Sequence, residues 1–384
     1  MANLSNDCKA ALELLSRSRN VLISGPPGTG KSKLLAEVAA AFAAGAPTVA
    51  GGGAPVHNPK SPVPIPPAAG AVDPAWAKIY PSANNKNRKV FRTVFHQNSK
   101  YRDFLTGLAP AINVKAGQAD FRVMHGTLYR ASEHAKQAGA ASLLIVDEIN
   151  RGPAVQVFGG SIVAIESDKR LAPGGGTRPE TQFFELLDPG TGDIIEYALP
   201  HDLYILAAMN QADASVEPLD VAFLRRWEPM KLEPDEQALR TFYNNVAGVN
   251  APLPPAATTT AHALEASVRA WKEVNKQISI GRGAEFQIGH GVLMADASPS
   301  AMPLLEALAF LCVGWAKVRA HVEEVFFGDV RGVATALNAM GTATHNPFAL
   351  DETQFADEIR YRLKGPVNLT PATIYDALRA FAGE

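Results

Sequence analysis

The sequence predicts an α/β protein with a parallel sheet flanked by helices, followed by a smaller, all-helical domain. Two observations predict this class. The first is a set of short apolar runs, Val21–Ile23, Ser142–Val146 and Leu203–Met209, of the kind that buried parallel strands need. The second is the segment after Glu233, where the remaining periodic stretches all have helical spacing.

The composition is that of an ordinary globular chain. Its 384 residues are 47% hydrophobic and 19% charged, and the formal net charge is -2. A charge so close to zero predicts no general attraction to nucleic acid or to an anionic membrane. The two cysteines, Cys8 and Cys312, cannot form a disulfide framework or a zinc site by themselves. Because neither a secretory leader nor an apolar run of about 18 residues is present, we expect a cytoplasmic protein without a membrane partner.

The segment Gly25–Ser32 carries the first functional signal, because it matches the phosphate-binding P-loop pattern at each fixed position. Its glycines permit a tight turn whose N–H groups can surround a phosphate, and a helix predicted over Lys33–Phe42 adds its N-terminal dipole. We expect Lys31 to bind the β- and γ-phosphates and Ser32 to bind Mg²⁺. The alternative is a glycine-rich turn with an incidental lysine. The predicted nucleotide-binding residues are Gly25, Pro26, Pro27, Gly28, Thr29, Gly30, Lys31 and Ser32.

Residues 46–88 are predicted to be an insertion into the nucleotide-binding domain. The stretch contains Gly51–Gly53 and Pro62–Pro67, and so long a loop is unusual inside a compact domain. We expect a tolerated surface insertion, with a partner contact through extended backbone as the alternative. A small basic cluster lies at Lys86–Arg92 and is expected to be a solvated loop unless it faces nucleic acid or a partner. A strand is predicted over Val90–Phe95.

Two acids stand directly after the third predicted strand. Asp147 and Glu148 follow the apolar run Ser142–Val146, which is typical of a Walker B motif when a P-loop precedes it. We expect Asp147 to bind Mg²⁺, directly or through water, and Glu148 to polarise the attacking water. The alternative is a strand that simply ends in aspartate.

The fourth predicted strand and the helix after it end in further candidate residues. Asn210 follows Leu203–Met209, where its amide can contact the attacking water and the terminal phosphate; a turn asparagine is the alternative. Arg225 and Arg226 end a short helix predicted over Leu219–Trp227. They can complement the helix dipole or reach a neighbouring subunit's γ-phosphate as an arginine finger, and the order of elements favours the finger. The predicted catalytic residues are Glu148, Asn210, Arg225 and Arg226, and the predicted metal ligands are Ser32 and Asp147.

Helical periodicity follows the last predicted strand. Helices are predicted over 235–245, 261–277, 302–321, 351–363 and 371–382, and no further strands are expected. Because Pro234 ends the preceding element, we place the domain boundary there. The predicted domains are therefore an α/β nucleotide-binding domain at 1–232 and a helical lid domain at 233–384. Within the first, a helix over 150–170 and a hairpin over 183–197 are expected.

The order of these motifs resembles that of AAA+ NTPases, and four local strings resemble McrB-type proteins in particular. The first string combines Phe95–Gln97, Tyr101–Phe104 and Gly107–Leu108. The others are Asp147–Gly152 with Val157–Gly159, Met209–Asp213 with Leu224–Trp227, and Phe286–His290. Together these strings cover most of the chain.

The resemblance implies a nucleotide-hydrolysing motor subunit of an McrBC-like restriction or anti-phage system. It implies use of ATP or GTP with Mg²⁺, and assembly into a ring that is commonly a hexamer. It also implies a separate McrC-like nuclease subunit, or another co-encoded effector, that stimulates hydrolysis. Because the motor starts almost at Met1, the DNA-reading domain usual in McrB proteins is not expected, and DNA is expected to be contacted only indirectly.

The sequence also departs from the McrB pattern. The family's arginine after Asn-x-x-Asp is Ala214 here, which leaves the choice between ATP and GTP open. The third arginine of the family's run is Trp227, so only Arg225 and Arg226 are finger candidates. A MoxR-like ATPase that remodels a protein client shares the motor parts and fits the lack of a DNA-reading domain. A nucleotide-gated scaffold would need no hydrolysis, and the intact Glu148 argues against it.

Overall fold

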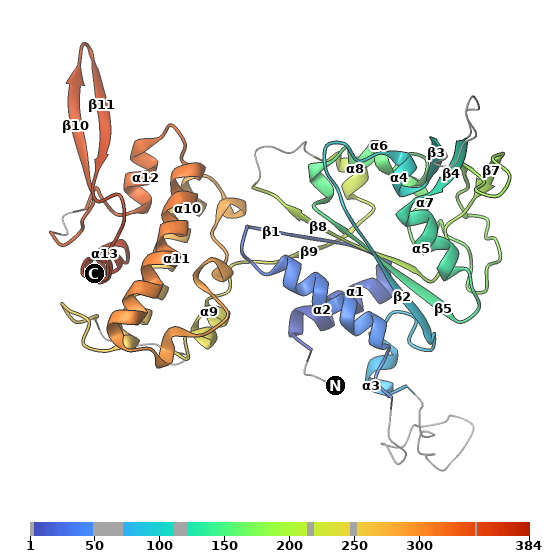
Figure 1. Ribbon diagram of the computed structural model, residues 1–384, viewed down its shortest axis with the longest axis horizontal. Coiled ribbons are helices and arrows are strands. Elements are labelled where there is room, and N and C mark those ends of the chain that lie inside the picture. The colour runs from blue at the N-terminus through green and yellow to red at the C-terminus, as the bar shows by residue number, and fades with distance from the viewer. Residues whose placement is uncertain (1–3, 49–71, 111–120, 213–218, 246–251, 342–343) are drawn as a thin grey trace. The chain divides into compact units, whose positions relative to one another are not determined.

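The structure is a computed structural model that describes residues 4–48, 72–110, 121–212, 219–245, 252–341 and 344–384 (Figure 1). It contains two compact units, Met1–Ser24 with Lys31–Lys231 and Gly25–Gly30 with Leu232–Glu384. The predicted domains, 1–232 and 233–384, differ from these units chiefly in Gly25–Gly30, because this loop makes its contacts with the second unit.

The first unit is built on a five-stranded sheet in the order β2-β5-β8-β1-β9. Its strands are β1 (Asn20–Gly25), β2 (Asn87–Val94), β5 (Ala140–Asp147), β8 (Leu203–Asn210) and β9 (Glu228–Lys231). The pairs β2–β5, β5–β8 and β1–β9 are parallel. The apolar runs of β1, β5 and β8 are buried along almost their whole length, as expected for a parallel sheet that is covered on both faces. The predicted α/β class is confirmed.

Helices cover both faces of this sheet (Figure 1). They include α1 (Asn6–Ser18), α2 (Lys31–Ala44) and α5 (Thr127–Ala135). The Arg88 guanidinium lies 4.1 Å from the ring centroid of Phe42 on α2, whereas the Phe91 ring lies 6.0 Å from that of His134 on α5. Because side chains at even and odd positions of a strand point to opposite faces, α2 and α5 lie on opposite sides of β2.

Two antiparallel hairpins complete the first unit. The hairpin predicted over 183–197 is confirmed by β6 (Phe184–Leu187) and β7 (Ile194–Tyr197). A second hairpin, which was not predicted from the sequence, pairs β3 (Thr106–Pro110) with β4 (Phe121–His125). The short helices of the unit are α3 (Pro74–Ala77), α4 (Tyr101–Phe104), α6 (Ala154–Phe158), α7 (Ser161–Ala164), α8 (Val221–Leu224) and the 3₁₀ turn η1 (Ile149–Arg151).

The helix predicted over 150–170 is divided into η1, α6 and α7. Pro153 precedes α6, and Gly159 follows it with a φ of 51°, a backbone conformation that glycine adopts readily. A Cβ on Gly159 would lie 2.7 Å from the Tyr101 ring, so close packing also requires glycine here. The predicted continuous helix is therefore wrong, because its apolar spacing spans two residues that interrupt helices.

The second unit is mostly helical. Its helices are α9 (Glu236–Phe242), α10 (Thr260–Gly281), α11 (Leu304–Val325), α12 (Val330–Ala336) and α13 (Ile374–Phe381), with 3₁₀ turns η2 (Ala284–Phe286), η3 (His290–Leu293) and η4 (Pro299–Ala301). Trp271 and Trp315 are buried in its core, and the Trp315 indole donates a 2.9 Å hydrogen bond to Ser267 on α10. Neither α10 nor α11, nor any other helix in the described residues, has the length and hydropathy that a membrane span requires.

The helix predicted over 351–363 is wrong. This segment forms an antiparallel hairpin of β10 (Ala349–Phe355) and β11 (Glu358–Lys364). Thr353, Ile359 and Tyr361 have strand propensity, and Ala356 turns the chain with a φ of 50°. The expectation that strands stop after residue 233 is therefore also wrong.

Only the ends of the predicted insertion at 46–88 lie in the described residues. Thr48 forms an antiparallel bridge with Val72, α3 follows at Pro74–Ala77, and β2 begins at Asn87. The glycine run and the proline run, within 49–71, lie outside the described residues. The surface or partner role of the insertion stays a prediction.

Candidate nucleotide-binding site

The loop Gly25–Gly30 joins β1 to α2 and has a conformation that depends on glycine. Gly28 and Gly30 have φ values of 79° and 90°, which L side chains rarely adopt. The Thr29 hydroxyl donates a 2.9 Å hydrogen bond to the carbonyl of Pro26, which closes the turn from inside. A Cβ built on Gly30 would meet nothing within 4 Å, so open space adjoins the loop just before Lys31.

A segment near the start of η3 supports this loop through its backbone. The N–H of Gly289 donates to the Pro27 carbonyl at 2.8 Å, and the N–H of Gly291 donates to the Gly28 carbonyl at 2.9 Å. A Cβ on Gly289 would lie 2.0 Å from the carbonyl carbon of Gly28, so only glycine permits this approach. The Phe286–His290 string therefore holds the conformation of the P-loop backbone, a role that its sequence did not indicate.

Lys31 is the first residue of α2 and is only 9% exposed. Burial lowers the pKa of its ammonium group from 10.5 to about 8, although the nearby carboxylates of Glu148 and Asp147 favour the charged form. A cation that is partly desolvated in this way gains from the approach of an anion. The electrostatics of Lys31 thus fit the phosphate-binding role predicted for it.

We expect nucleotide affinity to fall as the pH rises above about 8. A bound polyphosphate stabilises the protonated amine and raises its pKa, so above pH 8 binding must be accompanied by proton uptake. The dissociation constant is then expected to increase by up to about tenfold per pH unit above 8 and to stay nearly constant from pH 7 to 7.5. Equilibrium titration of a fluorescent nucleotide across pH 7 to 9 measures this.

Lys31→Arg is the matched control, since a guanidinium stays protonated throughout this range. Its profile should be flat, and a wild-type profile equally flat would contradict the role given to Lys31. The same lowered pKa also affects folding. Because the unfolded chain binds the proton more tightly, the Lys31 contribution to stability should rise with pH between about 8 and 10.5.

Glu148 and Asn210 lie side by side because β5 and β8 are parallel neighbours whose carboxyl ends coincide. The Asn210 amide donates to the two Glu148 carboxylate oxygens at 3.0 and 3.3 Å. Glu148 has φ 51° and ψ 44°, a left-handed conformation that is uncommon for residues other than glycine. Its N–H donates to the Asp147 carboxylate at 3.0 Å. The structure thus brings together the predicted acids and the predicted asparagine.

Asn150 and Arg151 join the same network, and sequence reasoning named them only as parts of a string. The Asn150 amide donates to the Asn210 carbonyl at 2.7 Å, and the Arg151 guanidinium pairs with Glu148 at 3.1 Å. Asn150 is buried, and its amide oxygen has no hydrogen-bond partner among the described residues. Their position immediately after the acid pair was the signal that could have identified them, because a tight 3₁₀ turn returns such side chains to the strand end.

The two adjacent arginines have different surroundings. Arg226 forms a 3.0 Å ion pair with Glu166, its guanidinium also donates to the Ala222 carbonyl, and its side chain is only 9% exposed. Arg225 ends α8, is exposed, and forms no ion pair in the described residues. Arg226 is thus engaged within its own chain, and Arg225 is the more accessible of the two.

The described residues fit a polyphosphate with a magnesium ion. Ser32 and Asp147 supply one hydroxyl and one carboxylate, and Mg²⁺ in nucleotide sites is usually held by few protein ligands together with phosphate oxygens. No group of three or more histidine, cysteine or acidic side chains with the arrangement of a metal site occurs in the described residues. The open space beside Gly30 and the buried ammonium of Lys31 provide room and charge for phosphate.

Two further sequence signals have different outcomes. Phe95 and Phe104, in the first McrB-like string, are buried with their ring centroids 5.4 Å apart and pack against Phe158, so they stabilise the core beneath the acid pair. Asp213 and Ala214 bear on the choice between ATP and GTP, and both lie outside the described residues.

Comparisons with known proteins agree with these features. A model of the AAA domain, dynein-related subfamily, matches residues 77–227. The EcoKMcrB subunit of the type IV methyl-directed restriction enzyme of Escherichia coli strain K12 is 25% identical over 326 residues, which are 83% of this chain and 56% of that relative. The component YdiS of the type II restriction enzyme BsuMI of Bacillus subtilis strain 168 is 34% identical over 110 residues, 25% of this chain and 29% of that relative.

The chain thus spans little more than half of the first relative and less than a third of the second. Among solved structures, PCH-2 of C. elegans overlaps 80% of this chain and 67% of its own at 14% identity, but its TM-score of 0.29 is too low to support an argument. These comparisons show a domain match together with a likeness to restriction-enzyme subunits, and the parallel sheet agrees with both. The chain therefore carries an AAA domain of the dynein-related type at residues 77–227 and is similar to McrB over most of its length.

Proposed function

We propose that this protein is the nucleoside triphosphatase subunit of a restriction complex and that its hydrolytic sites form between neighbouring copies. The observation that carries the proposal is the Glu148–Asn210 pair at adjacent strand ends, with a P-loop in the same chain. A carboxylate held by an amide in this way is suited to orient and deprotonate a water molecule. The proposed nucleotides are ATP or GTP, with Mg²⁺.

Each proposed role follows from the surroundings of a side chain. Lys31 and the N–H groups of Gly25–Gly30 would bind the polyphosphate, and Ser32 with Asp147 would hold the magnesium ion, which neutralises negative charge on the phosphates. Glu148 accepts the proton of the attacking water, and Asn210 keeps that carboxylate and the water in position. Arg151 pairs with Glu148 in the structure, so it also influences where the carboxylate points.

Hydrolysis also needs positive charge near the γ-phosphate in the transition state, and we propose that an arginine of a second copy of the chain supplies it. Arg225 is exposed at the end of α8, whereas the neighbouring Arg226 is held by Glu166. An arginine supplied by a neighbour makes hydrolysis depend on assembly. A closed ring, commonly a hexamer in proteins of this kind, would give each site such a neighbour.

The partner is proposed from the names of the relatives. EcoKMcrB is named as a subunit, and YdiS as a component, of a restriction enzyme. We therefore propose that this protein acts with a separate nuclease subunit of the McrC type or another co-encoded effector. DNA would be contacted mainly through that partner, in keeping with the net charge of -2. A cytoplasmic location stays a prediction.

The experiment that tests this function is purification with the co-encoded neighbouring proteins, followed by ATP and GTP hydrolysis assays. We expect specific turnover to rise with protein concentration and to increase further with the nuclease partner present. Turnover per protomer that is independent of concentration, or hydrolysis of neither nucleotide in the presence of Mg²⁺, would contradict the proposal. Co-purification of a protein client without nuclease activity would favour a remodelling ATPase instead.

A further inference from the structure

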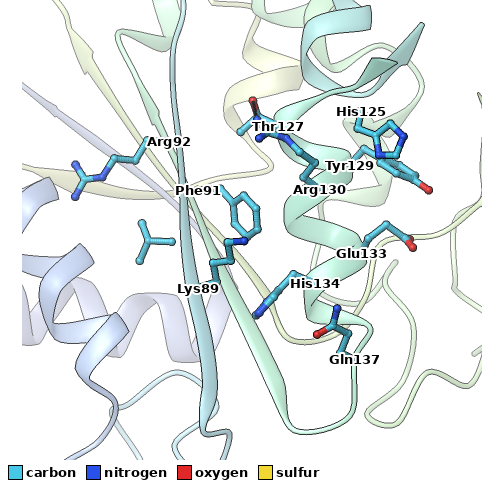
Figure 2. Close-up of a pocket in the computed structure, with 11 residues that line it drawn as sticks. Lys89, Phe91, Arg92, His125, Thr127, Tyr129, Arg130, Glu133, His134 and Gln137 are labelled. Carbon is cyan, nitrogen blue, oxygen red and sulfur yellow. Dashed lines mark hydrogen bonds between the residues drawn. The ribbon is translucent and has the colours of Figure 1, made fainter. Parts of the chain in front are cut away.

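A pocket of about 630 Å³ lies beside β2, at the edge of the five-stranded sheet and away from Glu148 and Asn210. Figure 2 shows Lys89 and Phe91 on the side of β2 that faces α5, and Arg92 on the other side. Arg130 and Glu133 approach from α5. The pocket therefore follows the outer edge of the strand and is open to both of its faces. We call it the β2-edge groove.

The outer edge of β2 directs backbone groups away from the rest of the sheet. The N–H of Asn87 bonds to Gly139 and that of Phe95 bonds to Asp147, so odd-numbered residues direct their backbone toward β5. Because the N–H and C=O of one residue in a parallel strand point to the same side, Arg88, Val90, Arg92 and Val94 direct theirs outward. Among the described residues, none of these four outward N–H groups has a backbone partner.

The charge of the β2-edge groove is positive. Lys89, Arg92 and Arg130 are exposed, and none of them forms an ion pair in the described parts of the chain. Glu133 is already neutralised, since it pairs with Lys136 at 2.9 Å and accepts a 2.6 Å hydrogen bond from Tyr197. The basic cluster predicted to be a solvated loop is thus part of a strand. Arg88 is engaged inward, with hydrogen bonds of 2.6 Å to the Phe42 carbonyl and 2.7 Å to the Pro81 carbonyl.

We propose that the β2-edge groove binds an extended, acidic segment of a protein partner, which pairs with β2 as a sixth strand of the sheet. An added strand would use the outward N–H and C=O groups, and carboxylates on either of its faces would meet Lys89 and Arg130 or Arg92. A peptide strand accounts both for the outward backbone groups that have no backbone partner in the described residues and for the three cations that form no ion pair there. A nucleic acid would use only the cations, and the chain as a whole has no positive charge to attract one.

Strand pairing at the outer edge of β2 can be blocked without disturbing the rest of the sheet. The N–H of Val90 points away from β5, so Val90→Pro removes an outward donor and leaves every β2–β5 hydrogen bond in place. Val90→Thr is the matched control, because it keeps both the N–H and the branched side chain. Lys89→Glu, Arg92→Glu and Arg130→Glu reverse the charge of the groove. Lys317→Glu makes the same change at an exposed position of α11 in the other unit.

The probe is a fluorescein-labelled peptide, Thr-Glu-Glu-Val-Glu-Glu-Val-Thr, titrated with the full-length protein and followed by anisotropy. Saturable binding to the wild type is expected. Each reversal in the groove should weaken it by about tenfold or more, and so should Val90→Pro, whereas Val90→Thr and Lys317→Glu should stay within about twofold of wild type. Far-ultraviolet circular dichroism and a thermal melt confirm that each variant is folded.

Several outcomes would overturn the proposal. One is the absence of saturable peptide binding, and another is unchanged binding by Val90→Pro, which would show that the edge is not used. Equally tight binding of an eight-nucleotide thymidine oligomer would identify a general anion surface instead. Nucleotide hydrolysis, measured in the same variants, separates this inference from the proposed function. A groove variant that loses peptide binding but hydrolyses nucleotide normally shows that the groove is separate from the hydrolytic site. If the wild type binds the peptide but hydrolyses no nucleotide, the proposed function fails and the groove proposal is still supported.

Discussion

Replacement of Arg225 by alanine is expected to lower the rate of nucleoside triphosphate hydrolysis by about 10³- to 10⁵-fold while leaving the protein folded. The protein should stay folded because Arg225 is exposed at the end of α8 and forms no ion pair in the described residues, so its removal disturbs little within the chain. The γ-phosphate of a neighbouring copy would lose the positive charge that stabilises the transition state. Steady-state hydrolysis at saturating nucleotide measures this loss.

Arg226→Ala is the matched control for Arg225→Ala. Arg226 pairs with Glu166 and donates to the Ala222 carbonyl, so its removal leaves partly buried acceptors without their donor. We expect a loss of stability of about 1–3 kcal/mol, seen as a lower melting temperature, with a much smaller loss of turnover below that temperature. The opposite pattern, with a stable but inactive Arg226→Ala variant and an active Arg225→Ala variant, would assign the finger to Arg226.

Glu148→Gln is expected to lower turnover by about 10²- to 10⁴-fold and to leave nucleotide affinity nearly unchanged. A glutamine keeps an oxygen that can accept from the Asn210 amide, so the local structure should persist, but it cannot take a proton from water. The surface pair with Arg151 is lost at little cost, because that guanidinium is 49% exposed. Single-turnover hydrolysis and nucleotide titration together separate chemistry from binding.

The control for Glu148→Gln is Glu323→Gln, which makes the same chemical change at an exposed partner of Arg319 on α11. Its turnover should match that of the wild type. Full turnover in Glu148→Gln would mean that this carboxylate is not the base. Full biological activity without turnover would favour a nucleotide-gated scaffold over a motor.

The parts of the fold that could be predicted are those fixed by local sequence. The apolar runs of β1, β5 and β8 are long enough to specify buried parallel strands, and the residues that follow each run stand at the sheet edge where such strands end. Lys31, Glu148 and Asn210 could therefore be named as candidate site residues from pattern alone. The helix predicted over 351–363 is wrong because, over so short a length, the pattern of apolar and charged residues fits both the helical period and the strand period.

The contacts that could not be predicted join residues far apart in the chain. Glu166 meets Arg226 across 60 residues, and no pattern near either one specifies the pair. Gly289 meets the backbone of Gly28, and a side chain on Gly289 would collide with that backbone. Such contacts arise from the packing of complete elements, so they distinguish Arg225 from Arg226 only once the structure is known.

The central claim is that each hydrolytic site takes Glu148 from one copy and Arg225 from the next. The most direct measurement mixes the two inactive variants, Arg225→Ala and Glu148→Gln, and follows hydrolysis. Random assembly at equal amounts restores an intact site at about one junction in four, so turnover near a quarter of the wild-type value is expected. Mixtures no more active than either variant alone, under conditions where they assemble together, would contradict the claim.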